Sequence, residues 1–322
     1  ALMRDNAKWL RKLELIPFLR DIGKHFRVNQ MLGKESVKAR LESEVGISFT
    51  EFAYMLTQAY DFLVLYQQDG ATLQVGGSDQ WGNITAGIDL IHRVEGGQAH
   101  GLTVPLVTTA SGSKFGKSEA GAVWLDPALT SPYKFYQFWV NADDRDVGKY
   151  LRYFTLLERE EIEALDRATA ERPGDREAQR ALARDVTAHV HGDEAARVAA
   201  QVSELLFGGG DPATLSDAVW YALRQEVPYA EVETDARPNG QTSGGAPPPD
   251  GALDVAELLV AVKLVKSKGE ARRLLEQGGL SANGRRLGAG DRFIARDQVL
   301  GAGFVLLRKG ARDYGLVRLA AP

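Results

Sequence analysis

The chain has 322 residues, of which 44% are hydrophobic and 25% charged, a composition typical of a globular protein with two or three domains. It has no cysteine, which excludes disulfides and thiolate metal sites, and its 5 histidines are too scattered to form a ligand set. No apolar run approaches the ~20 residues that cross a bilayer, so we expect no membrane association and a cytoplasmic location.

Charge is divided unevenly along the sequence. The formal net charge is −4, yet residues 251–322 hold 13 Lys+Arg against 7 Asp+Glu, which leaves the first 250 residues strongly acidic. A basic tail on an acidic body predicts nucleic-acid binding by the tail.

The best helical pattern of the first half covers residues 48–66, with a serine or threonine at its start that can cap the helix. Tyr54, Gln58 and Asp61 recur at i, i+4 and i+7 and therefore share one face of that helix. Because the other faces are apolar, we expect this polar stripe to be buried and hydrogen-bonded. The alternative is a solvated stripe on a surface helix.

A polar cluster follows the helix, in the sequence LQVGGSDQ. Residues 73–75 predict a short buried strand, and Gly76 and Gly77 after it let a ligand approach bare backbone. The polar residues come at the carboxyl end of the strand, where ligands bind in open α/β sheets. Asp79 can accept hydrogen bonds from ribose hydroxyls, and Gln80 can bond a carboxylate or a phosphate. The alternative reading is a tight turn.

A helix is expected over 84–92 and a second buried strand over 103–108, which leads to the sequence SKFGKS. Lys114, Lys117 and Ser118 lie on this loop. Two ammonium groups three residues apart suit negative charge developing on a phosphate. Lysine pairs are also common on ordinary solvated loops.

The rest of the chain divides by composition. Residues 143–233 are predicted to be helical throughout, and the Gly/Ser/Pro-rich stretch 235–250 is predicted to be a linker that lets the last domain move independently. In that last domain, Ser267 to Glu270 forms a capping box for a helix, and Asn283-Gly284 is a hairpin turn.

Six cations gather around this last helix and hairpin, and such a patch suits phosphate-backbone binding by shape, with a solvated charged face as the alternative. They are Lys266, Lys268, Arg272, Arg273, Arg285 and Arg286.

These motifs, in this order, closely resemble the bacterial tyrosyl-tRNA synthetases, a class I family, over essentially the whole chain. KFGKS resembles the lysine-rich loop usually written KMSKS, and the last domain resembles the S-four RNA-binding domain. The resemblance implies a multidomain α/β protein. Its parts would be the C-terminal half of a Rossmann-like catalytic domain with a dimer-interface insertion (1–140), an α-helical anticodon-region domain (141–234), a flexible linker (235–250) and the S-four domain (251–322).

The resemblance also implies an activity. L-tyrosine would react with ATP, in the presence of Mg²⁺ and without a protein-bound metal cluster, and the tyrosyl group would pass to tRNA(Tyr), on a homodimer. Tyrosine would be bound by Tyr54, Gln58, Asp61 and Gln80, and ATP by Gly77, Asp79, Lys114 and Lys117. Catalysis would rest on Lys114, Lys117 and Ser118.

The sequence departs from this family in one respect. It has no His-Ile-Gly-His motif, and the strand and helix that should carry the motif are expected upstream of Ala1. We therefore expect the sequence to be truncated and its activity alone to be impaired. The alternatives are a tryptophan-specific synthetase, which would not be expected to carry the S-four tail, and a non-catalytic RNA-binding protein derived from a synthetase.

Overall fold

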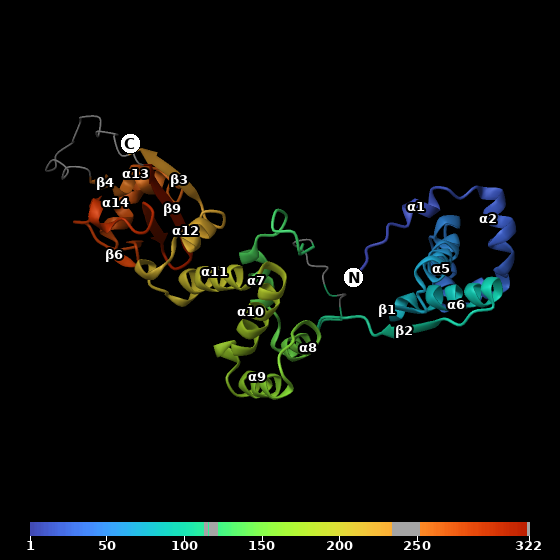
Figure 1. Ribbon diagram of the computed structural model, residues 1–322. Coiled ribbons are helices and arrows are strands. Elements are labelled where there is room, and N and C mark those ends of the chain that lie inside the picture. Colours follow the sequence, from blue (N-terminus) through green and yellow to red (C-terminus); the bar gives the residue numbers. More distant parts are fainter. Residues whose placement is uncertain (113–114, 116–121, 234–251, 321–322) are drawn as a thin grey trace. The chain divides into compact units, whose positions relative to one another are not determined.

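The computed structural model describes residues 1–112, 115, 122–233 and 252–320. Lys114, Lys117, Ser118 and the predicted linker lie outside the described residues. The chain forms two compact units, Ala1–Phe115 and Gly116–Pro322, which are described separately (Figure 1). Of the helices described, none is both long enough and apolar enough to cross a membrane.

The first unit is organised around helix α5, Phe49–Asp69. The Ser48 hydroxyl accepts a hydrogen bond from the Glu51 backbone N–H, and the Glu51 carboxylate accepts one from the Ser48 N–H, so a capping box starts the helix. Gly70, with a φ of 66°, ends it. The predicted helix is confirmed, and it continues three residues past the predicted end.

Helix α6, Trp81–Glu95, packs along α5. The contact is close because α6 has a glycine at the crossing: a Cβ on Gly87 would lie 2.8 Å from Cδ1 of Phe62. Phe62, Leu90 and Ile91 are buried in the core between the two helices. Any larger residue at position 87 would force the helices apart.

Short helices precede α5 and contribute to the same core through Phe18, Ile22 and Met31. Phe18 meets the Tyr60 ring of α5 edge to face, with 5.9 Å between the ring centroids. These helices are α1 (Ala7–Leu10), α2 (Leu15–Asp21), η1 (Gly23–His25), α3 (Val28–Leu32) and α4 (Glu35–Leu41).

Two parallel strands, β1 (Leu73–Gly77) and β2 (His100–Val104), lie beside α6. Helix α6 covers one face of the pair, where a Cβ on Gly101 would lie 2.6 Å from Ile84. The other face is open, and Val75 and Val104 are 58% and 52% exposed. The expectation of buried strands is therefore wrong for this structure, because the helix covers only one face, and the second strand ends before residue 108.

The second unit begins with a helical part. Its first helix, α7 (Pro132–Val140), buries Phe135, Tyr136 and Trp139 against the helices that follow. These are α8 (Asp144–Phe154), α9 (Arg159–Glu171), α10 (Glu177–His191), α11 (Asp193–Ser203), a π-helical turn η4 (Glu204–Gly208) and α12 (Asp217–Leu223).

A five-stranded sheet with the order β3-β9-β8-β5-β6 completes this unit, together with helices α13 (Val255–Ala261) and α14 (Lys268–Glu276) and the short strands β4 (Leu253–Asp254) and β7 (Phe293–Ile294). The predicted hairpin is confirmed: Asn283 and Gly284 have φ of 49° and 81° between β5 and β6. The five strands are β3 (Tyr229–Glu233), β5 (Leu280–Ala282), β6 (Arg285–Leu287), β8 (Phe304–Lys309) and β9 (Asp313–Ala320).

The structure corrects two expectations about this part of the chain. Residues Tyr229–Glu233 were predicted to be helical, but they pair in parallel with β9, whose backbone groups give them partners that the local sequence does not reveal. The helical part and the sheet also share a core, in which Trp220 stacks on Phe304 with 5.5 Å between the ring centroids. The independent movement predicted from the linker is therefore wrong for the residues of this core.

We predict that Phe304→Ala destabilises this shared core by about 3–5 kcal/mol, because it removes a fully buried ring and the stacking contact of that ring with Trp220. Denaturant unfolding followed by tryptophan fluorescence would measure the loss. Phe207→Ala is the matched control, since that ring is 70% exposed and its removal should cost less than about 0.5 kcal/mol. Equal losses for the two variants would contradict the shared core.

Candidate functional site

The candidate site lies at the carboxyl end of β1, where the turn η2 (Ser78–Gln80) leads into α6. A Cβ on Gly77 would lie 2.7 Å from Oδ1 of Asp79, and one on Gly76 would lie 3.2 Å from Cβ of Gln80. The two glycines thus allow the polar turn to fold back on its strand. Both glycines are only partly buried, and the expectation that a ligand approaches their bare backbone stays a prediction.

One amide joins the two predicted polar motifs. Asn83 Nδ2, in the first turn of α6, donates to Gln58 Oε1 at 3.0 Å and to Gln80 Oε1 at 3.4 Å. Gln80 Nε2 donates in turn to Asp79 Oδ2 at 3.3 Å. The structure therefore brings the stripe on α5 and the GGSDQ cluster into one hydrogen-bonded group. Sequence reasoning missed Asn83, although its position three residues after Gln80 on the same helix start was a usable signal.

The Asp61 carboxylate is hydrogen-bonded by two residues near the amino-terminal end of the sequence. Its carboxylate accepts hydrogen bonds from Trp9 Nε1 at 2.7 Å and from Asn6 Nδ2 at 2.9 Å. A carboxylate has about four lone-pair positions, so two donors fix its orientation and leave room for a further hydroxyl donor. Neither Asn6 nor Trp9 was predicted, because no sequence pattern connects them with a residue more than fifty positions away.

The expectation for the polar stripe holds only in part. Gln58 and Asp61 are partly buried and hydrogen-bonded, as expected. Tyr54, near the start of α5, is instead 58% exposed.

Gln74 is a further polar residue that sequence reasoning missed. It lies on β1 two residues before Gly76, hence on the same face of the strand, and its Oε1 atom is buried with no hydrogen-bond partner among the described residues. A buried acceptor without a partner is costly, and such groups mark places where a ligand or a water can bind. Within the described residues, no three His, Asp or Glu side chains are grouped so as to hold a metal ion.

The six predicted cations of the last domain are not equivalent. Lys268 pairs with Glu257 (Nζ–Oε1 2.6 Å), Arg285 pairs with Asp291 (Nη2–Oδ1 2.9 Å), and Arg286 Nε donates to the Gly278 carbonyl. Lys266, Arg272 and Arg273 are exposed and have no ion pair with any residue that the structure describes.

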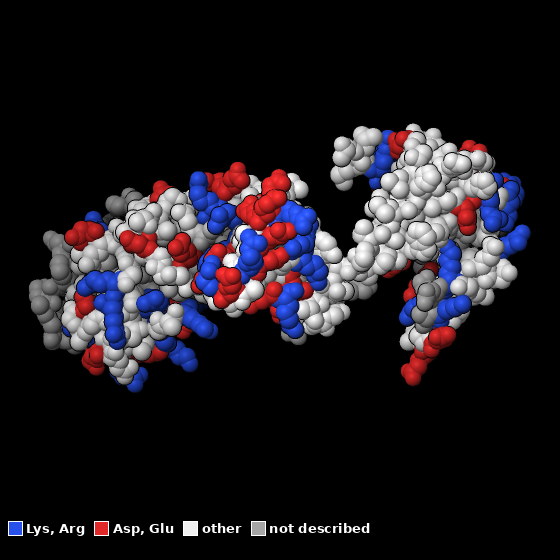
Figure 2. Space-filling model, turned by 90° about the horizontal axis from the view of Figure 1, so that it is seen from below, with Lys and Arg blue, Asp and Glu red and all other residues white. Residues whose placement is uncertain are grey.

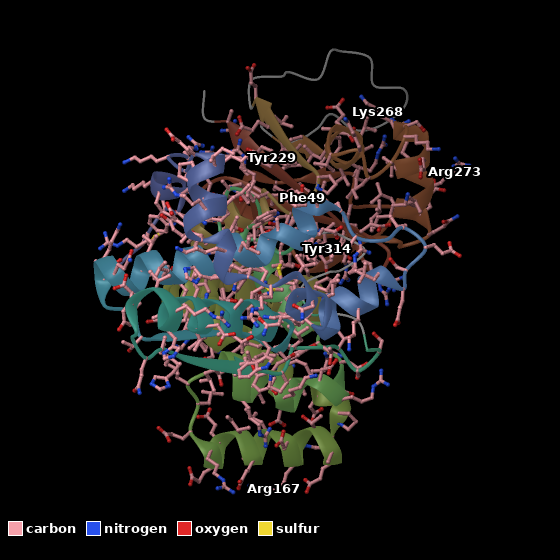
Figure 3. The ribbon with its side chains drawn as sticks, turned by 90° about the vertical axis from the view of Figure 1, so that its right-hand side faces the viewer. Phe49, Arg167, Tyr229, Lys268, Arg273 and Tyr314 are labelled. Atoms are coloured by element: carbon pink, nitrogen blue, oxygen red, sulfur yellow. The ribbon has the colours of Figure 1, made fainter. Side chains whose placement is uncertain are left out.

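Figures 2 and 3 show where these cations lie on the C-terminal part. Figure 2 shows basic side chains gathered on the C-terminal part, whereas the helical part carries mixed charge. In Figure 3, Lys268 and Arg273 lie on the same outer side of that part.

Comparison with known proteins identifies the family. Residues 2–208 match the model for tRNA synthetases class I (W and Y), and residues 248–317 match the tyrosine–tRNA ligase SYY-like C-terminal domain. The tyrosine–tRNA ligases of Anaeromyxobacter dehalogenans (strain 2CP-1) and Thermobifida fusca are 54% and 49% identical, each over 99% of this chain and 72% of its own length.

Solved structures agree with this match. A C-terminally truncated mitochondrial tyrosyl-tRNA synthetase of Aspergillus nidulans is similar with a TM-score of 0.54 and 35% identity, over 63% of this chain and 57% of that chain. The corresponding Coccidioides posadasii enzyme gives a TM-score of 0.51 and 38% identity, over 61% and 56%. The chain therefore belongs to the tyrosine–tRNA ligase family of class I aminoacyl-tRNA synthetases.

Proposed function

We propose that this chain is a tyrosine–tRNA ligase, which activates L-tyrosine with ATP and transfers the tyrosyl group to tRNA(Tyr). The observation that carries this proposal is the 54% identity to a tyrosine–tRNA ligase over 99% of the chain. Nothing in the comparisons favours a non-catalytic RNA-binding protein, and the relatives named above are ligases for tyrosine rather than tryptophan.

Tyrosine binding is assigned to the stripe on α5. Tyr54 and Gln58 would bind the α-amino group, and Asp61 the phenolic hydroxyl. The support for Asp61 is its geometry: two donors orient the carboxylate, and lone pairs remain for the substrate. The support for Gln58 is the bond from Asn83, which fixes the amide and ties it to the neighbouring helix.

ATP binding is assigned to the turn after β1 and to the KFGKS loop. The backbone of Gly77 and the carboxylate of Asp79 would hold the ribose, and Gln80 would orient the tyrosine carboxylate or the α-phosphate. The carboxylate attacks the α-phosphate in line and pyrophosphate leaves, which requires no protein nucleophile. Catalysis is then orientation and stabilisation of negative charge.

Lys114, Lys117 and Ser118 of the KFGKS loop lie outside the described part of the chain. Lys114, Lys117 and Ser118 would hold the β- and γ-phosphates of ATP, which enters with Mg²⁺. Their support is chemical, since ammonium groups and a hydroxyl match the charge and the acceptor oxygens of a polyphosphate.

Transfer RNA binding is assigned to the helical part and to the C-terminal part, the latter as an S-four domain whose sheet also includes strand β3 from the preceding segment. Exposed cations without ion pairs suit the phosphate backbone, since they need not break an ion pair to bind it. The protein would act in the cytoplasm as a homodimer. Phe49, the first residue of α5, and Val45, in the turn before it, are 80% and 88% exposed and would supply apolar surface for the dimer contact.

The direct test of this function is tyrosine-dependent ATP–pyrophosphate exchange by the chain within its complete natural coding sequence, followed by charging of tRNA(Tyr). We expect exchange with tyrosine to exceed exchange with tryptophan by at least about 100-fold, because only tyrosine presents a hydroxyl to Asp61. Absence of exchange with retained tRNA binding would instead identify a non-catalytic RNA-binding protein.

We predict that Asp61→Asn lowers kcat/KM for tyrosine by about 10- to 100-fold, the effect of losing one charged hydrogen bond, while phenylalanine is used no worse. Tyrosyl-tRNA synthetases are themselves the usual illustration of a site that rejects a substrate lacking its hydroxyl. Exchange assays with the two amino acids measure the ratio. Asp69→Asn, an acid of the same helix paired with Arg4, is the control, and an unchanged ratio in Asp61→Asn would refute the assignment.

We predict that Arg273→Gln weakens tRNA binding more than Arg285→Gln. Arg273 has no ion pair among the described residues, whereas Arg285 is already paired with Asp291. Filter binding over a range of salt concentrations would show the difference as a slope reduced by about 1 for Arg273→Gln. Equal effects of the two substitutions would show that the existing ion pairs do not decide which cations bind RNA.

A further inference from the structure

Lys34 connects the short helices at the beginning of the chain with the start of α6. It precedes α4, and its ammonium group donates to the backbone carbonyl of Gly82 and lies 3.4 Å from the hydroxyl oxygen of Thr85. The group is part-buried. Burial lowers the pKa of Lys34, and the nearby Asp89 carboxylate acts in the opposite direction.

This position is unfavourable for a cation. The start of a helix carries a partial positive charge, so an ammonium group there is destabilising, and its partial burial adds to the cost. The backbone carbonyls at the start of α6 also have another donor, because the Thr85 hydroxyl lies 2.9 Å from the carbonyl oxygen of Trp81 and 3.1 Å from that of Gly82. Stability of the helix alone does not account for a lysine at this place.

The turn that Lys34 holds belongs to the site. Gln80 occupies the N-cap position of α6, and Asn83 lies in the first turn of that helix, next to Gly82. Through Asn83 this turn contacts Gln58 on α5. A shift of the turn would therefore move both amides that join the two motifs.

We propose that Lys34 is a positioning residue for tyrosine activation. It fixes the first turn of α6 so that Gln80 and Asn83 meet Gln58 in the geometry that the reaction needs, and its charge adds to the positive potential of the helix start. The carboxylate and the α-phosphate that react are both anionic, so this potential favours their approach. The inference rests on the proposed function.

The test is Lys34→Met, which removes the charge and the donor but keeps the length of the side chain. We expect kcat for tyrosine-dependent exchange, measured within the complete natural coding sequence, to fall about 10- to 100-fold, with a smaller change in KM for tyrosine, since misplacement of about 1 Å costs this much. Lys38→Met is the matched control. Lys38 is exposed on α4, one turn further along, and the structure records no side-chain hydrogen bond or ion pair for it.

A double-mutant cycle with Asn83→Ala separates positioning from a general loss of stability. If Lys34 acts through the first turn of α6, the two losses are not additive, and the double variant is nearly as active as the slower single variant. Additive losses would overturn the proposal, and so would unchanged exchange with reduced tRNA charging only. If Lys34→Met does not fold by circular dichroism, Lys34→Gln, which keeps a donor, replaces it in the same cycle.

The outcomes also distinguish this proposal from the proposed function. A wild-type protein without exchange would refute the function itself. A wild-type protein with exchange, in which Lys34→Met behaves like Lys38→Met, would refute only the role of Lys34.

Discussion

The hydrogen bond from Asn83 to Gln58 is the contact on which the candidate site depends. It joins the two helices that carry the polar motifs, and it forms only because those helices approach closely at Gly87. A side chain there would meet the ring of Phe62 and separate the helices. The geometry of the polar site is thus set by the apolar core beneath it, since a small residue in that core decides whether two amides can meet.

Small residues also determine the geometry of the turn η2, which carries the other polar residues of the site. Gly76 and Gly77 let η2 fold back onto β1, which brings Asp79 and Gln80 within reach of the amide network. Once the turn is folded in this way, the polar side chains have few alternative positions. A site that acts by orientation benefits from such restriction, because the entropy of ordering is lost on folding rather than on substrate binding.

Local signals predicted much of this structure. The helix cap at Ser48 and the hairpin at Asn283-Gly284 are each encoded within a few residues, and both appear as expected. The features that the sequence did not reveal depend on contacts between residues far apart in the chain. Strand β3 is a strand because β9 lies beside it, and Asp61 meets Trp9 across 52 positions of sequence. No periodicity records such contacts, since each is made only after the chain has folded.

Which charged side chains form ion pairs is likewise not visible in the sequence, and this pairing bears on mechanism. In sequence, Lys268 and Arg273 are equivalent cations of one helix, but the structure pairs only Lys268 with a carboxylate. The first unit has a similar feature: Asn6, Trp9 and Lys34 all come from the segment before α5. They donate hydrogen bonds to Asp61 or to the first turn of α6. In a reaction without a protein nucleophile, groups that hold the binding residues in place control the rate almost as directly as the residues that touch the substrate. Under the proposed function, the segment before α5 would therefore help to hold the binding residues in place, as well as contributing to the core.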